Sequence, residues 1–137
     1  MTTKLYNNGT WTKARKHSFI VSALRKSLTR WGPKSKCISN ARISRGVYRC
    51  ELCKKDGPAT LPPKGDNKRR RKNIVADHIQ PIVDPSVGFV SYDTWIARAY
   101  VELDKFQAIC WQCHHDKTNE ERAIATDRRR REKESKE

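Results

Sequence analysis

The sequence predicts an α+β fold in which two short strands and a helix form a ββα unit between flanking basic helices. Asn73–Ile79 and Phe106–Ile109 each read as a short strand, because each is a brief segment with apolar residues that ends at a turn or break. From His114 to about Arg131 the residues are mostly good helix formers. Two Cys-x-x-Cys pairs accompany these segments and predict a metal staple for the unit.

The two pairs supply four thiolates, from Cys50, Cys53, Cys110 and Cys113. Structural zinc prefers four ligands in a tetrahedron, commonly four cysteines, and two Cys-x-x-Cys turns close such a site. We therefore expect one structural Zn²⁺. Redox motifs are the alternative, but the presence of two such pairs favours metal. The fifth cysteine, Cys37, is expected to be a partly buried free thiol.

The composition bounds the class of protein. A chain of 137 residues is long enough for one compact domain. Its hydrophobic content of 36% and charged content of 33% predict a small core, which a bound metal would stabilise. The net charge of +15 predicts a polyanionic partner, most commonly nucleic acid. A solvated basic surface, or an arm for a ribosome or a membrane, is the alternative.

Three regions are expected along the chain. Residues 1–45 read as a basic N-terminal segment with a loose start and a helix over about 11–31, which Gly32-Pro33 ends. The main domain is expected over 46–126 and a charged helix end that frays into solvent over 127–137. An apolar stripe supports the first helix, formed by Ile20, Leu24, Leu28 and Trp31. The helix could be a scaffold only, or could also lay a basic face against DNA.

The middle of the chain reads as mostly irregular. Residues 34–49 and 54–73 are expected to lack regular structure, and Ser91 is expected to cap a helix over about 92–101. The second irregular segment carries a basic run that is predicted to contact phosphates: Lys68, Arg69, Arg70, Arg71 and Lys72. Alternatively, this run could be a nuclear localisation signal or a solvated loop.

Three residues outside the cysteine set carry the chemistry. If the two strands lie side by side and the helix packs across them, Asp77, His78 and His114 can converge. A carboxylate and an imidazole can hold a divalent ion, and a second imidazole can act as general base, which suits phosphodiester hydrolysis. Lys117 is predicted to contact the DNA backbone or to cap the polar face of the helix.

With these residues in view, the chain resembles the HNH endonucleases, whose nuclease core is the ββα-metal or His-Me finger fold. The resemblance covers about residues 46–122 and is greatest to the small phage-type members. It rests on four matching segments: Cys50-x-x-Cys53, Val75–Pro81, Gly88–Arg98 and Phe106–Thr118. It implies that His78 is the general base, that Asp77 and His114 bind the catalytic Mg²⁺ or Mn²⁺, and that the cysteines bind zinc.

The chain departs from that family at one position. Lys105 stands where the family usually has the Asn that helps orient the base, and Asp104 or a backbone carbonyl would have to replace it. His115 is the alternative metal ligand to His114. One residue along a helix turns a side chain by about 100°, so the two histidines cannot share one role.

The resemblance implies a phage-encoded, homing-type enzyme that nicks or cuts double-stranded DNA, as a monomer or a transient dimer. A non-catalytic zinc-ribbon DNA-binding module is the alternative, and an RNA-binding or ribosome-associated zinc protein is a third reading that leaves the histidines unexplained. No signal peptide or membrane span is evident, so we expect an intracellular protein, in the host cytoplasm if it is phage-encoded, and no membrane partner.

Overall fold

The computed structural model describes residues 3–136 and divides the chain into two compact units, one ending at Trp31 and one beginning at Gly32. The first two residues of the predicted lead-in and the last residue of the predicted tail lie outside the described range. The division falls before the predicted boundary at 45/46, because residues 32–45 fold with the second unit.

The first unit is a hairpin followed by a helix. Strands β1 (Lys4–Tyr6) and β2 (Trp11–Thr12) pair antiparallel, and helix α1 spans Lys13–Leu28. The predicted loose lead-in is therefore wrong. The reversal is made by Asn7, Asn8 and Gly9, whose φ values of 53°, 58° and 73° lie in the left-handed region that Asn and Gly tolerate best. Thr12 then caps α1 by accepting a hydrogen bond from Arg15 N.

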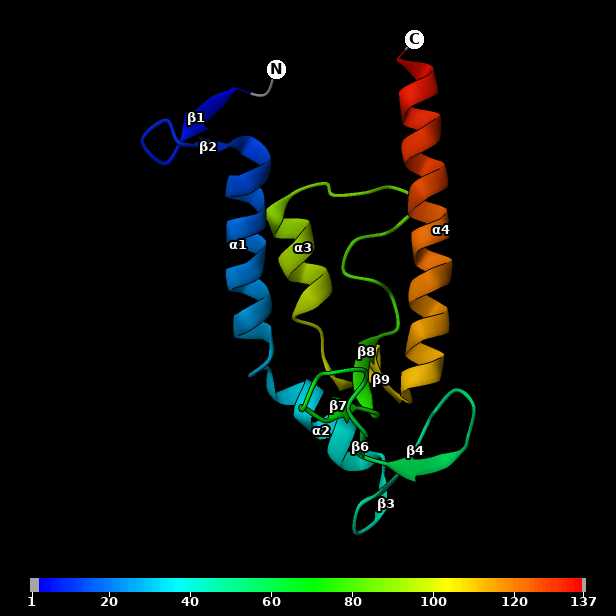
Figure 1. The fold of residues 1–137 in the computed structure, drawn as a ribbon. Coiled ribbons are helices and arrows are strands. Elements are labelled where there is room, and N and C mark those ends of the chain that lie inside the picture. Colours follow the sequence, from blue (N-terminus) through cyan, green and yellow to red (C-terminus); the bar gives the residue numbers. More distant parts are fainter. Residues whose placement is uncertain (1–2, 137) are drawn as a thin grey trace. The chain divides into compact units, whose positions relative to one another are not determined.

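The second unit is mixed α+β, which confirms the predicted fold class at that level (Figure 1). Its sheets are small and antiparallel, in the orders β3-β4-β5, β6-β7 and β8-β9. The elements in chain order are α2 (Gly32–Asn40), β3 (Arg42–Ser44), β4 (Val47–Arg49), β5 (Asp56–Pro58), β6 (Thr60–Leu61), β7 (Arg71–Lys72), β8 (Val75–His78), α3 (Tyr92–Ala99), the 3₁₀ turn η1 (Leu103–Lys105), β9 (Phe106–Ile109) and α4 (Trp111–Ser135).

The predicted irregular segments are wrong in part. Gly32-Pro33 begins α2 and does not merely end the preceding helix, because a proline in the first turn has no amide hydrogen to leave unsatisfied. Residues 34–49 contain most of α2 together with β3 and β4, and residues 54–73 contain β5, β6 and β7. Helix α2 packs on β8 and β9, which joins this region to the main body of the unit.

Strands β8 and β9 lie close to their predicted places, and β9 has the predicted bounds. Their antiparallel register sets Asp77 opposite Gln107 and His78 opposite Phe106. Figure 1 shows both strands beside the N-terminal end of α4. The buried side chains around them include Ile74, Trp95 and Ile109, so the core of the unit lies at this junction.

Helix α3 follows the prediction, since Ser91 Oγ accepts from Thr94 N at 3.1 Å and caps it. Helix α4 is longer than predicted at both ends, and the predicted fraying of residues 127–137 is wrong for the described part. Asp127 pairs with Arg130 at 2.6 Å and with Arg131 at 3.2 Å, and such pairs one turn apart support an exposed helix. Within residues 3–136, none of the helices combines the length and apolar character needed to cross a membrane.

Candidate metal centre and adjoining histidine site

Four cysteines of the second unit form one cluster. The Sγ atoms of Cys50, Cys53, Cys110 and Cys113 all lie within 4.8 Å of one another, and those of Cys53 and Cys110 are 3.8 Å apart. Zn–S bonds of about 2.3 Å in a tetrahedron place neighbouring sulfurs about 3.8 Å apart. The donor set and its spacing therefore fit a metal ion such as zinc.

The backbone brings the two pairs together. The first pair ends in a tight turn at Lys54, whose φ is 65° and whose N–H donates to Cys50 O at 3.0 Å. Inside this turn Glu51 N donates to Ala108 O at 2.9 Å, while Ala108 N donates to the Glu51 carboxylate. Glu51 thus binds the first turn to β9, and β9 leads directly into Cys110 and the second pair.

The thiols of the cluster differ in acidity. Burial raises the pKa of Cys50, but hydrogen bonds from the backbone N–H groups around it outweigh burial and bring the pKa to about 6. Burial and the neighbouring cysteines raise the pKa of Cys113 to about 12. Four adjacent thiolates repel one another, so a cation is needed for all four to ionise together.

Cys37 lies outside this cluster, on α2. Its side chain is buried more fully than predicted, with 5% of its surface exposed. Burial raises its pKa to about 11, with Glu51 and Asp77 adding to the effect. A thiol with this pKa is almost wholly protonated at neutral pH and is a poor nucleophile.

Asp77 is the centre of the second group of side chains. Its Oδ2 accepts from Lys117 Nζ at 2.6 Å and from Gln107 Nε2 at 3.0 Å. Its Oδ1 lies 3.9 Å from His114 Nε2, and the Asp77 side chain is only 11% exposed. The carboxylate is therefore held with one oxygen bonded and the other directed at His114.

Lys117 is bound inside the protein. Besides Asp77, its ammonium donates to His78 O at 2.6 Å and lies 3.5 Å from Glu121. Lys117 thus binds the carboxylate that we predict to hold a metal. Its predicted contact with a DNA phosphate stays a prediction. Its position one helical turn after His114 is the signal that it shares that face of α4.

The His78 ring is fixed by the backbone. Its Nε2 lies 2.8 Å from Ala99 O at the C-terminal end of α3, and its ring centroid is 4.6 Å from that of Phe106. Desolvation by burial lowers the pKa of His78, and this outweighs the opposing effect of the Ala99 carbonyl. The neutral imidazole is therefore favoured.

Lys105, where we predicted a departure from the HNH pattern, does not contact that ring through its side chain. The Lys105 ammonium is exposed, 3.8 Å from the Asp104 carboxylate. Its backbone carbonyl accepts from Ile79 N at 3.0 Å and so continues the β8–β9 ladder. Of the two substitutes predicted for the missing Asn, the backbone carbonyl is the one that contacts His78, and it belongs to Ala99.

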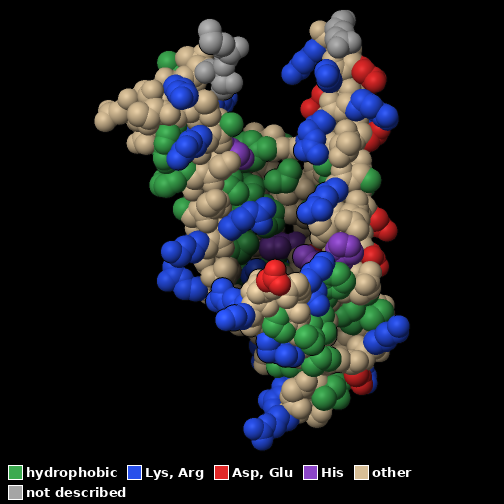
Figure 2. All heavy atoms as spheres, viewed as in Figure 1, with side chains coloured by type: hydrophobic (Ala, Val, Ile, Leu, Met, Phe, Trp, Pro, Cys, Tyr) green, Lys and Arg blue, Asp and Glu red, His purple; other side chains and the backbone are tan. Residues whose placement is uncertain are grey.

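The two adjacent histidines of α4 have different surroundings. His114 faces Asp77, whereas the His115 ring stacks on Trp111 with centroids 4.8 Å apart and an angle of 10°. His115 Nε2 also lies 3.3 Å from Asn119 Nδ2. The structure therefore brings His114 to Asp77 and holds His115 elsewhere. Figure 2 shows histidine side chains next to Lys and Arg at the start of α4.

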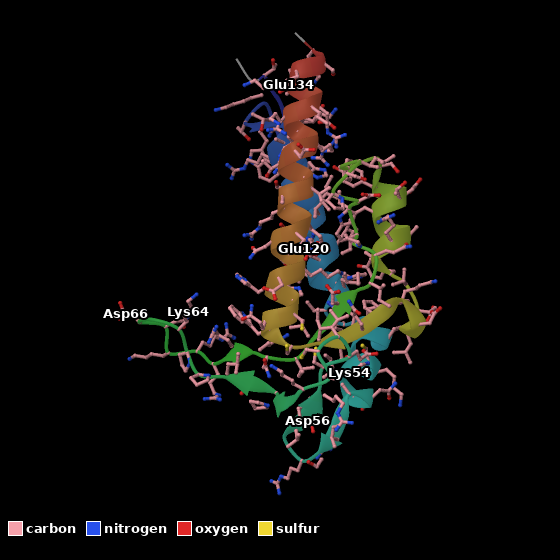
Figure 3. The ribbon with its side chains drawn as sticks, turned by 90° about the vertical axis from the view of Figure 1, so that its right-hand side faces the viewer. Lys54, Asp56, Lys64, Asp66, Glu120 and Glu134 are labelled. Atoms are coloured by element: carbon pink, nitrogen blue, oxygen red, sulfur yellow. The ribbon has the colours of Figure 1, made fainter. Side chains whose placement is uncertain are left out.

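The predicted phosphate-binding run lies on the β6–β7 hairpin, whose loop carries Lys64 and Asp66 at its tip (Figure 3). Arg70 donates to Thr60 Oγ1 at 3.0 Å, and Arg71 donates to Pro62 O at 3.1 Å. Arg71 also lies over the Trp111 ring, 5.3 Å from its centroid. Arg71 is half-buried, whereas the other four members of the run, Lys68, Arg69, Arg70 and Lys72, are exposed.

One polar residue at the junction was not predicted. Asn73 is 8% exposed and donates from Nδ2 to Pro58 O at 2.7 Å. Its Oδ1 accepts from Trp111 N at 3.2 Å and so satisfies a free N–H at the start of α4. Asn73 is the first residue of the predicted strand, and Asn is also a common turn residue, so nothing in the sequence separates this role from an ordinary turn.

Replacing Lys117 with methionine is expected to destabilise the protein by about 1–3 kcal/mol, because the largely buried Asp77 carboxylate and the His78 carbonyl both lose a charged donor. The methionine keeps the aliphatic stem and removes only the ammonium. Urea unfolding of the zinc-loaded protein measures the change.

Glu121→Gln is the matched control, since it removes only the 3.5 Å pair with Lys117. It should cost less than about 1 kcal/mol, as partly exposed ion pairs do. If both variants lose the same stability, Lys117 does not hold Asp77 in solution.

Comparison of the chain with protein-family models, with curated proteins and with solved structures gave no match.

Proposed function

We propose that the protein is a metal-dependent HNH-type DNA endonuclease that hydrolyses phosphodiester bonds, with β8, β9 and α4 as its ββα-metal core. The observation that carries the proposal is the pair formed by Asp77 Oδ1 and His114 Nε2, 3.9 Å apart, with the His78 ring fixed at the end of the same strand. A zinc-ribbon binding module needs the cysteines but has no use for this pair.

The pair fits a divalent ion. Ligand atoms about 2.1 Å from one ion lie at most about 4.2 Å apart, and 3.9 Å is within that limit. Lys117 and Gln107 occupy the other carboxylate oxygen, so Oδ1 is directed at the space beside His114. When bound, Mg²⁺ or Mn²⁺ would offset the charge that develops on the scissile phosphate and on the leaving 3′ oxygen.

Only two protein ligands and a nearby ammonium make a weak cation site. Magnesium is commonly held by one or two carboxylates together with oxygens of a substrate phosphate. Lys117 partly neutralises Asp77, which weakens the attraction of the carboxylate for a free ion. The proposal therefore includes DNA as part of the metal site, with the substrate phosphate supplying further oxygens.

His78 would take the proton from the attacking water. A carbonyl oxygen can only accept, so Nε2 carries the hydrogen that binds Ala99 O, and Nδ1 keeps its lone pair. Burial lowers the pKa of the ring and keeps it neutral, as a base must be. In this proposal the Ala99 carbonyl takes the place of the Asn that HNH enzymes usually use to orient the base.

Plasmid cutting tests the proposal, and the adjacent histidines supply a matched pair of variants. With Mg²⁺ or Mn²⁺ the wild-type protein should convert supercoiled plasmid to nicked or linear DNA. His114→Ala should lose this activity, because it removes half of the ion's protein ligands. His115→Ala should keep most of it, because His115 stacks on Trp111 and lies away from Asp77.

Cutting by His114→Ala at the wild-type rate would remove the assigned metal ligand. If the wild-type protein binds the plasmid but cuts it with none of the divalent ions, the binding module is favoured. The ratio of nicked to linear product over time shows whether the protein makes single nicks or paired cuts.

A further inference from the structure

The first unit, which ends at Trp31, has an unusual charge pattern. It contains seven Lys and Arg residues and no Asp or Glu: Lys4, Lys13, Arg15, Lys16, Arg25, Lys26 and Arg30. On the face drawn in Figure 2, this unit carries Lys and Arg side chains and no acidic ones. Its cations therefore have no carboxylate within their own unit to pair with.

The exposed side of α1 arranges part of this charge in a row. Arg15, Phe19, Ser22 and Lys26 follow one another at intervals of four, three and four residues, so they share one helix face. All four are exposed, and Phe19 is 62% exposed. Arg15 and Lys26 are about 16 Å apart along the helix, a length over which duplex DNA carries about ten phosphates.

Aromatic contacts hold the N-terminal end of this row in place. The Arg15 guanidinium lies over the Trp11 ring, 4.9 Å from its centroid, and the Trp11 and Phe19 rings are 5.1 Å apart. On the neighbouring side Lys16 lies over the Tyr6 ring at 4.6 Å. The hairpin thus orders two cations without neutralising them, which lowers the entropic cost of a later contact.

We propose that the row Arg15–Phe19–Ser22–Lys26 on α1 is a second nucleic-acid contact, which binds the phosphate backbone of duplex DNA outside the cutting site. The inference rests on the proposed function, which makes DNA the substrate of the second unit. The absence of any acid in the unit favours a polyanion over a protein surface of mixed charge. Phe19 lies between the two cations and would pack on the sugar edge of the backbone.

The test is the salt dependence of binding in the full chain, without divalent ions, to a fluorescent duplex. Neutralising two phosphate contacts in Arg15→Gln/Lys26→Gln should flatten the slope of log K against log salt by about 1.8. The matched control, Lys133→Gln/Lys136→Gln, makes the same charge change near the end of α4 and should flatten the slope by less than half as much. Phe19→Ala should weaken binding and leave the slope unchanged.

Equal slopes in the two double variants would overturn the inference. So would loss of binding to phosphatidylserine vesicles with an unchanged slope on DNA, which would make the row a membrane contact. Plasmid cutting at saturating protein separates this site from the catalytic one, since the Arg15→Gln/Lys26→Gln protein should still cut. If the wild-type protein cuts with none of the divalent ions while the slopes still differ, the proposed activity fails and this contact stands.

Discussion

His78→Ala is expected to lower plasmid cutting by about 10²–10⁴-fold at saturating Mg²⁺, the range that general bases contribute. The reason is that Nδ1 of His78 is the atom left with a lone pair once Nε2 binds Ala99 O. Binding should persist, because His78 contributes no positive charge when neutral. The rate of loss of supercoiled plasmid, followed beside duplex affinity by anisotropy, measures both.

A second variant distinguishes loss of the general base from loss of the fold. The His78 ring packs against Phe106 at 4.6 Å, so alanine leaves a gap in the junction of β8 and β9. His78→Gln fills more of the space and can still donate to Ala99 O, but it has no basic nitrogen. Both variants should show this large loss of cutting while binding one zinc ion and the duplex like the wild type. Robust cutting by His78→Gln would show that another group takes the proton.

The sequence predicted best where the local signal and the tertiary contacts agree. The segment Phe106–Ile109 is mostly apolar and directly precedes a cysteine pair, and it forms β9 with those bounds. Ser91 precedes an amphipathic segment and caps α3 as predicted. In both cases the residue pattern is compatible with only one kind of secondary structure.

The prediction failed where one pattern admits two structures. Gly32-Pro33 can end one helix or begin the next, and only the packing of α2 on β8 and β9 decides in favour of a helix. The strands β3 to β7 are two or three residues long, too short for an alternation of apolar and polar residues to show. Hydrogen bonds made by Asn73 and by the backbone of the first cysteine pair hold the segments next to these strands together.

Some residues of the candidate site could be predicted from the sequence and others could not. The sequence marked Asp77 and His114, because two adjacent strands with a helix packed across them would bring these side chains together, and the structure places Asp77 Oδ1 and His114 Nε2 3.9 Å apart. It could not mark Ala99, because the group that holds His78 is a backbone carbonyl and every residue has one. It assigned Lys117 to the DNA backbone or to the polar face of the helix, since a lysine on a helix carries no sign of the contact with Asp77 that the structure shows.

Removing the metal from the cysteine cluster is expected to unfold the second unit. Structural zinc contributes roughly 10–16 kcal/mol of folding free energy, while a domain of this kind is stable by about 5–15 kcal/mol in total. The core that would have to offset that loss is small: its buried side chains include Ile74, Trp95, Phe106 and Ile109, and the equally buried Cys50 belongs to the candidate metal cluster. A zinc-selective chelator should therefore abolish the cooperative thermal transition seen by circular dichroism.

Cysteine variants locate the effect, because the chain offers a fifth cysteine as a control. Cys113→Ser should bind no zinc at stoichiometric concentration and should lack the cooperative transition. Cys37→Ser makes the same change at a buried thiol outside the cluster, so it should keep one zinc per chain and lose only about 1–3 kcal/mol for burying a hydroxyl. The cluster also positions β9 and α4. Glu51 binds the first cysteine turn to β9, and Cys110 leads into α4, the helix that carries His114. An unchanged transition after zinc removal would mean that hydrogen bonds and the small core alone hold this junction, and His114 would then keep its place beside Asp77 without the metal.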